Sequence, residues 1–347
     1  MRIAFDCSPL VRPHPPGVVR VARELLAALE ARARIEVVRL APQPHERLRA
    51  WRQRALPKLV AERGLDGFHS FVSAIPLRGS FPRVQTVHEL PWRHGVQENS
   101  DLRHRFWAAV GPLRAQRVLV PTEHVARDLR RRLLPGAGRV TACAWGVAPS
   151  FAPEPPPSVV DEVVLGRYRL PEGALALCPG AVREKKDLAA VLHGLARLRA
   201  RHGPALHLVV TGPETPQLRR DLGLVSRLGL ARFVSTPGEV EEEHLPALYR
   251  LAAVVPVLSR SEGFGLPVLE ALACGTPVVV PHESAQAEVA GERAIRVDAR
   301  DADSVADGLE RALLEREELR YVLPERALEL TWERCAAQVE AIWEELT

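Results

Sequence analysis

Short apolar runs alternate along this chain with longer segments in which apolar residues recur three or four positions apart. The short runs are typical of strands buried on both faces, and the periodic segments are typical of amphipathic helices. The expected strands are residues 2–6, 35–40, 66–70, 84–90, 118–121, 140–145, 174–179, 206–212, 233–238, 253–258 and 278–280. This alternation predicts an α/β protein built from βα units around parallel sheets.

Helices are expected between these strands, and a proline-rich run divides the series in two. The expected helices are residues 18–31, 45–63 with a kink at Pro57, 122–134, 188–198, 245–251, 267–274, 303–315 and 331–347. A chain of 347 residues is long enough for two domains, and the run 149–157 is a natural linker. We therefore divide the chain into domains 1–155 and 156–330, followed by a terminal helix, 331–347.

The stretch 259–281, SRSEGFGLPVLEALACGTPVVVP, predicts a glycine loop, a helix and a buried strand. Pro267 suits the first helical turn, and Gly275 suits the left-handed position that ends a helix. Glu262 lies on the loop and Glu270 on the helix, so both carboxylates are expected to face the groove at the helix N-terminus. Free N–H groups there favour an anion, and a carboxylate accepts two hydrogen bonds from a diol. The stretch therefore suits a phosphate beside a polyol.

This stretch resembles the signature of the retaining family 4 glycosyltransferases, in which two glutamates stand eight positions apart. That family has the GT-B fold, two facing Rossmann-like domains with a last helix that crosses back to the first. The resemblance implies that Glu262 contacts the hydroxyls of the donor sugar and Glu270 the ribose of the nucleotide. The loop and helix start, Gly263, Phe264, Gly265 and Leu266, are implied to bind the donor as well.

Three further strings resemble family elements and occur in family order. Lys185-Lys186-Asp187-Leu188 is similar to the family's Arg-Lys-Asn-Leu, which implies that Lys185 and Lys186 neutralise the donor diphosphate. Thr-Val-His-Glu-Leu at 86–90 places His88 beside the transferred sugar. The string 17–20 keeps one glycine, Gly17, of the family's phosphate-binding loop.

The resemblance implies retaining transfer of a hexose-type sugar, mannose or glucose, from a nucleotide diphosphate sugar to an acceptor hydroxyl. The lysines and the helix dipole can stabilise the departing diphosphate, so no metal and no cofactor is expected. Two alternatives keep the same fold: a phosphorylase or epimerase, or a non-catalytic protein that binds a sugar nucleotide.

Charge and cysteine content bear on the partners and the compartment. Residues 1–157 hold 25 Lys and Arg against 13 Asp and Glu, a net +12, whereas the remainder holds 22 against 30, a net −8. A basic first domain suits an anionic or lipid-linked acceptor, and its segments 47–63 and 127–132 suit peripheral contact with a membrane. A basic surface that faces only solvent would give the same net charge. No nucleic-acid partner is expected. Five scattered cysteines indicate neither disulfides nor zinc, and no apolar run spans a bilayer, so a cytoplasmic enzyme is expected.

Overall fold

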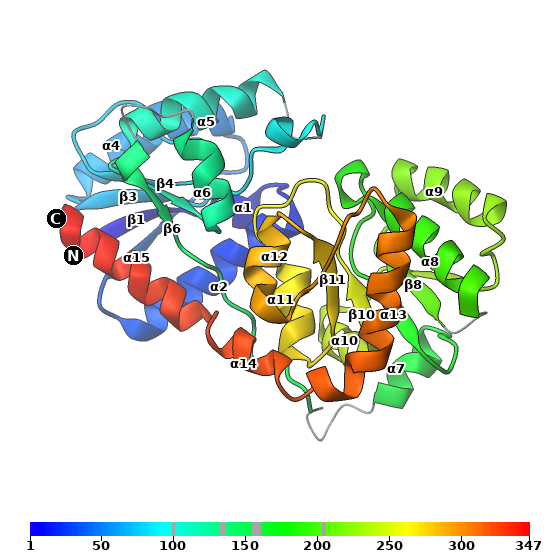
Figure 1. Ribbon diagram of the computed structural model, residues 1–347. Coiled ribbons are helices and arrows are strands. Elements are labelled where there is room, and N and C mark those ends of the chain that lie inside the picture. The colour runs from blue at the N-terminus through cyan, green and yellow to red at the C-terminus, as the bar shows by residue number, and fades with distance from the viewer. Residues whose placement is uncertain (99–100, 132–136, 155–160, 203–205) are drawn as a thin grey trace. The chain divides into compact units, whose positions relative to one another are not determined.

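The computed structural model divides the chain into two compact units, each an α/β sandwich (Figure 1). The first unit comprises Met1–Gly146 and Leu330–Thr347, and the second comprises Val147–Glu329. The structure describes all residues except 99–100, 132–136, 155–160 and 203–205, so the ends of the expected linker 149–157 and of the expected helix 122–134 lie outside the described residues.

The first unit is built on a six-stranded parallel sheet with the strand order β2-β1-β3-β4-β5-β6. Its strands are β1 (Arg2–Asp6), β2 (Glu36–Leu40), β3 (Gly67–Ser70), β4 (Arg83–Thr86), β5 (Arg117–Val120) and β6 (Val140–Ala142). Strands β1, β3 and β4 are buried almost throughout because helices cover both faces of the sheet. This burial explains why they appear in the sequence as apolar runs.

Helices of the first unit follow most of its strands. They are α1 (Ser8–Val11), α2 (Pro16–Arg32), α3 (Leu48–Ala50), a π-helical turn η1 (Trp51–Ala55), α4 (Leu56–Glu62), η2 (Pro91–His94), α5 (Leu102–Arg114), α6 (Glu123–Arg130), η3 (Ala137–Arg139) and α15 (Trp332–Leu346). The expected caps are confirmed: the Thr122 side chain accepts from the Val125 N–H, and the Thr331 side chain accepts from the Arg334 N–H.

The segment 48–62 is one helix interrupted by a π turn rather than a helix ended at Pro57. Pro57 cannot donate to the carbonyl four residues earlier, and the π turn lies directly before it. Trp51, Leu56 and Val60 belong to the hydrophobic core of the unit. The apolar stripe of this segment is therefore buried and cannot insert into a membrane, as the core-facing alternative expects. The electrostatic contact expected of its exposed basic residues stays a prediction.

The terminal helix α15 packs within the first unit, as a GT-B fold requires. Trp343 is fully buried over β3, where its ring lies 6.4 Å from that of His69. The Gln338 amide donates to the Ala142 carbonyl at 2.9 Å, and Arg32 of α2 pairs with Glu340 at 2.8 Å. Both chain termini consequently lie at the same edge of this unit (Figure 1).

The second unit repeats the design with the strand order β12-β11-β10-β7-β8-β9. Its strands are β7 (Leu175–Cys178), β8 (His207–Thr211), β9 (Val234–Gly238), β10 (Ala252–Pro256), β11 (Val278–Pro281) and β12 (Ile295–Val297). Its helices are α7 (Asp161–Arg167), η4 (Glu184–Lys186), α8 (Leu188–His202), α9 (Pro216–Arg227), η5 (Glu242–His244), α10 (Leu245–Leu251), α11 (Leu266–Ala273), α12 (Ala285–Ala290), η6 (Gly291–Arg293), α13 (Ala302–Leu319) and α14 (Leu323–Leu328).

Several elements differ from the sequence-based expectation. The expected strands 84–90 and 140–145 end early, at Thr86 and Ala142. Six helices of the described residues, α1, α5, α7, α9, α12 and α14, and the strand β12 were not predicted. Gly17 lies in the first turn of α2 and not in the loop that the sequence suggested. Among the described helices, none combines the length and hydropathy that a bilayer crossing requires.

Candidate donor site

The strand order of the second unit reverses between β7 and β10. The chain runs from β7 to β8 and β9 on one side, then crosses back to place β10 on the other side of β7. Loops after two such strands leave in opposite directions and open a crevice at the carboxyl ends, where α/β proteins bind ligands. The segments 179–187 and 257–265 are these two loops.

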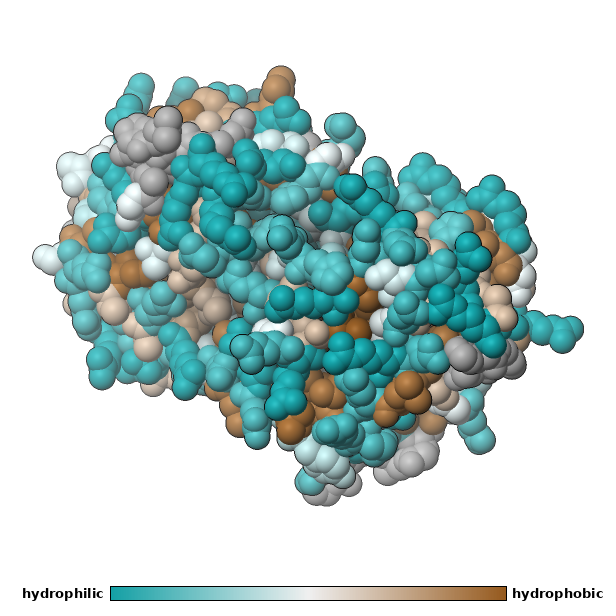
Figure 2. Space-filling view, in the orientation of Figure 1, coloured by the Kyte–Doolittle hydropathy of each residue, from teal (hydrophilic) through white to brown (hydrophobic). Residues whose placement is uncertain are grey.

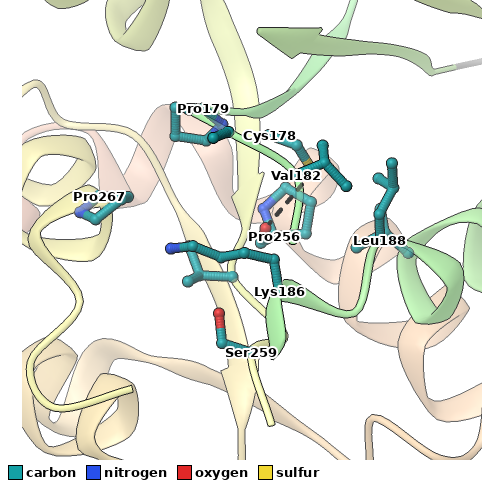
Figure 3. Close-up of a pocket in the computed structure, with 12 residues that line it drawn as sticks. Cys178, Pro179, Val182, Lys186, Leu188, Pro256, Ser259 and Pro267 are labelled. Carbon is teal, nitrogen blue, oxygen red and sulfur yellow. Dashed lines mark hydrogen bonds between the residues drawn. The ribbon is translucent and has the colours of Figure 1, made fainter. Parts of the chain in front are cut away.

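A pocket of about 420 Å³, part of it open to solvent, lies in this crevice. It is lined by the ends of β7 and β10, the start of α8, and Pro267 in the first turn of α11. Figure 3 shows Lys186 extending across the pocket, with the end of its side chain toward Pro267. The enclosed part of the pocket is small, about 40 Å³, so the crevice is largely open to solvent.

Three contacts hold the two loops together. The Arg260 N–H donates to the Lys185 carbonyl at 2.8 Å, and the Arg260 guanidinium pairs with Asp187 at 2.9 Å. Lys186 Nζ lies 3.2 Å from Glu262 Oε2. A bond from the Gln286 amide to the Ser259 carbonyl, 3.0 Å long, supports the second loop from α12. The crevice is therefore formed by connected loops.

Glu262 is held ionised by the two lysines that the sequence analysis assigned to a diphosphate. Burial alone would raise the pKa of its carboxyl, but the charges of Lys186 and Lys185 outweigh burial and lower this pKa to about 2. Both partners of the Lys186–Glu262 pair are largely shielded from water, with side-chain exposures of 21% and 16%. The pair thus places a fixed cation and a fixed anion at the edge of the pocket.

Helix α11 begins at Gly265, which has a backbone conformation that only a residue without a Cβ adopts readily. Gly265 has φ +92°, and a Cβ there would lie 3.3 Å from Gln286 Cγ and 3.4 Å from Val268 Cγ2. This conformation lets the chain turn sharply from the loop into the helix, with Gly265 as the N-cap. In the first turn of α11, Pro267 has no N–H and the Val268 N–H donates to the Gly265 carbonyl at 2.9 Å. The N–H that can serve an anion beside Lys186 is therefore that of Leu266.

Glu270 lies deeper than the groove that the sequence analysis assigned to it. Its side chain is 5% exposed, and Oε2 accepts a hydrogen bond of 2.6 Å from the Tyr249 hydroxyl of α10. Tyr249 is fully buried against Phe151 and was not singled out from the sequence, where a lone aromatic at helical spacing indicates only core packing. Tyr249 fixes the direction of the Glu270 carboxylate.

The predicted donor residues fall into two groups. Most of them meet around the crevice of the second unit: Lys185, Lys186, Glu262, Gly263, Phe264, Gly265, Leu266 and Glu270. His88 and Gly17 belong to the first unit. His88 Nε2 lies 2.6 Å from the Phe71 carbonyl, and its ring lies 5.0 Å from that of Trp145, so neighbours from two other segments orient this side chain.

A family comparison agrees with the architecture of this unit. Residues 169–329 match the family model of glycosyl transferases group 1. The second unit is a group 1 glycosyl transferase domain. The match includes both crevice loops and α11, and the predicted relationship to the family 4 glycosyltransferases is confirmed.

Curated relatives match part of this chain. The MMP alpha-(1->4)-mannosyltransferase of Mycolicibacterium hassiacum is 36% identical over 46% of this chain and 40% of its own length. The GDP-mannose-dependent alpha-(1-6)-phosphatidylinositol monomannoside mannosyltransferase of Mycobacterium tuberculosis is 30% identical over 56% of this chain and 57% of its own length. The chain spans about half the length of the curated relatives it matches.

Solved structures match the whole chain at low sequence identity. The sucrose-phosphate synthase of Thermosynechococcus elongatus superposes with a TM-score of 0.77 at 20% identity, covering 99% of this chain and 98% of that one. Anabaena HepE in complex with UDP and glucose gives a TM-score of 0.75 at 14% identity, with full coverage of both chains. The predicted GT-B fold, with a group 1 domain as its second unit, is confirmed.

Proposed function

We propose that this protein transfers a hexose-type sugar, mannose or glucose, from a nucleotide diphosphate sugar to an acceptor hydroxyl with retention of anomeric configuration. The observation that carries the proposal is the Lys186–Glu262 pair beside the first turn of α11, at the strand crossover of the group 1 domain. The named relatives support the sugar class, since the M. tuberculosis relative is called a GDP-mannose-dependent mannosyltransferase.

The chemistry of the pair matches what such a transfer demands. When the sugar–phosphate bond breaks, its electron pair goes to the departing diphosphate, and negative charge grows there. Lys186, with Lys185 and the Leu266 N–H at the start of α11, stabilises this charge without reorganisation. The Glu262 carboxylate, ionised at neutral pH, accepts hydrogen bonds from the donor sugar and orients it.

The remaining assignments follow the family resemblance. We assign Glu270 to the nucleotide ribose, Gly263, Phe264, Gly265 and Leu266 to the donor, and His88 to the transferred sugar. We assign Gly17, at the start of α2, to the donor phosphate side. Because fixed cations neutralise the leaving group, we expect transfer without a metal or cofactor.

For the acceptor, we propose an anionic or lipid-linked molecule reached at a membrane surface. The support comes from α5, whose exposed face carries Leu102, Phe106 and Leu113, exposed by 85%, 48% and 54%. Figure 2 shows hydrophobic side chains among hydrophilic ones over this helix, at the top of the view. Arginines at 103, 105 and 114 flank the apolar face, the pattern of a helix that lies in an anionic lipid interface.

The function is tested by incubating the purified protein with GDP-mannose, UDP-glucose and related donors, with EDTA present, and measuring release of nucleoside diphosphate. We expect release from at least one donor, accelerated by acceptor and indifferent to inorganic phosphate. Release that requires phosphate would favour a phosphorylase, and conversion of the sugar without release would favour an epimerase. Binding without turnover under any condition would indicate a non-catalytic binding protein.

The two glutamates are separated by their effects on binding and on turnover. We expect Glu270→Gln to weaken nucleoside diphosphate binding, because a ribose-bound carboxylate contributes to affinity. Glu262→Gln should leave that binding unchanged and lower the transfer rate. Calorimetry with the nucleotide and steady-state kinetics measure the two effects. Tyr249→Phe is the matched control for Glu270, since it removes the supporting hydrogen bond and keeps the carboxylate.

A further inference from the structure

Two histidines and an aspartate converge in the first unit, and none of the three is assigned to the donor. His94 belongs to η2, and His124 and Asp128 stand four positions apart on one face of α6. One ligand atom from each of the three residues lies within 4.8 Å of the other two. The sequence hides this cluster, because His94 is 30 positions from His124 and matches no metal-ligand spacing.

The three side chains are already oriented toward one another. His94 Nε2 lies 2.8 Å from Asp128 Oδ2, and the His94 and His124 rings stack with centroids 5.5 Å apart. The Asp128 side chain is only 13% exposed, so its carboxylate is largely shielded from water and faces the basic side chains of Arg93 and His94.

We propose that His94, His124 and Asp128 form a binding site for a divalent transition-metal cation, with Zn²⁺ as the best fit. Two imidazole nitrogens and one carboxylate oxygen are a ligand set that zinc takes with water in the fourth position. Tetrahedral bonds of about 2.1 Å place ligand atoms about 3.4 Å apart, so small side-chain rotations complete the site. Hard cations such as Mg²⁺ prefer oxygen ligands and fit less well.

Arg93 competes with the cation and regulates its affinity. Its Nε lies 3.3 Å from Asp128 Oδ1, and its side chain is 29% exposed, so the guanidinium can leave toward solvent when a cation binds. In the absence of metal, the positive charge of Arg93 neutralises the negative charge of the Asp128 carboxylate. If the cluster is a metal site, removing the positive charge of Arg93 strengthens metal binding. If the cluster is only a structural set of ion pairs, the same change lowers the stability of the fold and does not affect metal binding.

Occupation of the site ties η2 to α6 and thereby holds the segment that precedes η2. This segment leaves β4 at Thr86 and carries His88. The cation would add to the stability of the first unit and take no part in sugar transfer. The inference does not rest on the proposed function, because it concerns only the stability and metal affinity of the first unit.

The test is titration of the metal-free full-length protein with Co²⁺ and Zn²⁺. We expect one saturable Co²⁺ site with the intense visible absorption of a tetrahedral ion, displaced by Zn²⁺, and a Zn²⁺-dependent rise in Tm. His124→Asn and Asp128→Asn should each weaken Co²⁺ binding by roughly tenfold or more. Loss of a residue that only supports a metal ligand already lowers metal affinity about tenfold, and these two residues are themselves proposed ligands. Arg93→Gln should tighten Co²⁺ binding.

His45→Asn is the matched control, because His45 is an exposed histidine of the same unit and should bind metal as wild type does. Folding of each variant is checked by circular dichroism, and Glu243→Gln excludes the exposed cluster of Glu241, Glu243 and His244 as the source of the signal. An absorption spectrum that survives in both His124→Asn and Asp128→Asn would overturn the proposal. Absence of saturable Co²⁺ binding in the wild type and in Arg93→Gln would overturn it equally.

Discussion

At the scale of single residues, the account depends most on Lys186. Its amino group is fixed by Glu262 at the edge of the pocket and is the nearest assigned cation for a departing diphosphate. We predict that Lys186→Ala lowers kcat by roughly 10²- to 10³-fold, as removal of one preorganised charge-stabilising donor does elsewhere. Binding of the free nucleoside should change little.

Steady-state kinetics and calorimetry separate the two effects. Arg183→Ala, a loss of charge in the same loop at a residue without an assigned role, controls for a general change in electrostatic potential. Near-wild-type kcat/KM in Lys186→Ala would remove this lysine from the reaction. Equal losses in nucleoside affinity and in kcat/KM would make it a ground-state binder.

Glu262 gives a prediction about pH. Its pKa in the folded protein is about 2, below the value of about 4.3 expected in an unfolded chain, so ionisation of Glu262 stabilises the fold. This contribution is complete above about pH 5 and is lost as the pH falls toward 2. The difference in unfolding free energy between wild type and Glu262→Gln should be constant from pH 5 to 8 and shrink below pH 5.

Urea denaturation of both proteins across this range measures the difference. The same pKa predicts that no ionisation of Glu262 appears in the activity profile between pH 5 and 8, so Glu262 does not serve as a general acid. A stability difference that first changes between pH 6 and 8 would place the pKa of Glu262 far above 2.

At the scale of elements, the start of α11 determines whether the Leu266 N–H faces the pocket. Gly265→Ala adds a Cβ at φ +92°, a conformation that costs an ordinary residue about 1–2 kcal/mol. We predict this loss of stability, together with weaker nucleotide binding, because the first turn of α11 must shift. Gly223→Ala is the matched control. Gly223 lies on the exposed face of α9 with open space around it, so alanine there should leave stability unchanged or raise it by up to about 1 kcal/mol.

Periodicity predicts elements well where both faces are buried and poorly where polar residues dominate. The strands β1, β10 and β11 follow directly from their apolar runs, and Gly275 ends α11 as predicted, with φ +73°. Helix α9 is rich in arginine and leucine and was not predicted, because its apolar face is narrow. The π turn at 51–55 was not predicted as such, because Pro57 signals an irregularity but not its type. The buried pair of Arg52 with Asp6, 2.8 Å apart, joins this turn to β1 over 46 positions of sequence, a contact that no local pattern encodes.

The candidate site was predictable as a set of motifs but not as a set of contacts. Lys186 and Glu262 are 76 positions apart, and only the crossover from β9 to β10 brings them to 3.2 Å. The Tyr249–Glu270 and Arg260–Asp187 contacts depend on side-chain directions that no local pattern encodes.

At the scale of the whole molecule, the charge of the first unit and the exposed face of α5 give the prediction about membranes. We expect the protein to float with anionic liposomes at low ionic strength and to be released by salt, since screening acts over about 8 Å at physiological salt. Phe106→Ser with Leu113→Ser should reduce flotation. Leu314→Ser, at a leucine that is 79% exposed in the second unit, is the matched control.

The arginines of α6 are less promising for this contact than the sequence suggested. Arg130 pairs with Glu123 and donates to the Val140 carbonyl, so it is engaged within its own unit. Arg132 lies outside the described residues. Equal recovery with anionic and neutral liposomes at every salt concentration would leave a soluble acceptor as the better interpretation.

The central claim is that the crevice between β7 and β10 supports sugar transfer with retention and without a metal. The most direct measurement follows the reaction by NMR with an α-configured nucleotide sugar, an acceptor and EDTA. It reads the one-bond C1–H1 coupling of the new glycosidic linkage as it first appears, because this coupling separates the two anomers of mannose as well as those of glucose. The account predicts an α-linkage formed at an undiminished rate in EDTA. A β-linkage as the first product, or transfer that occurs only after a divalent cation is restored, would contradict it.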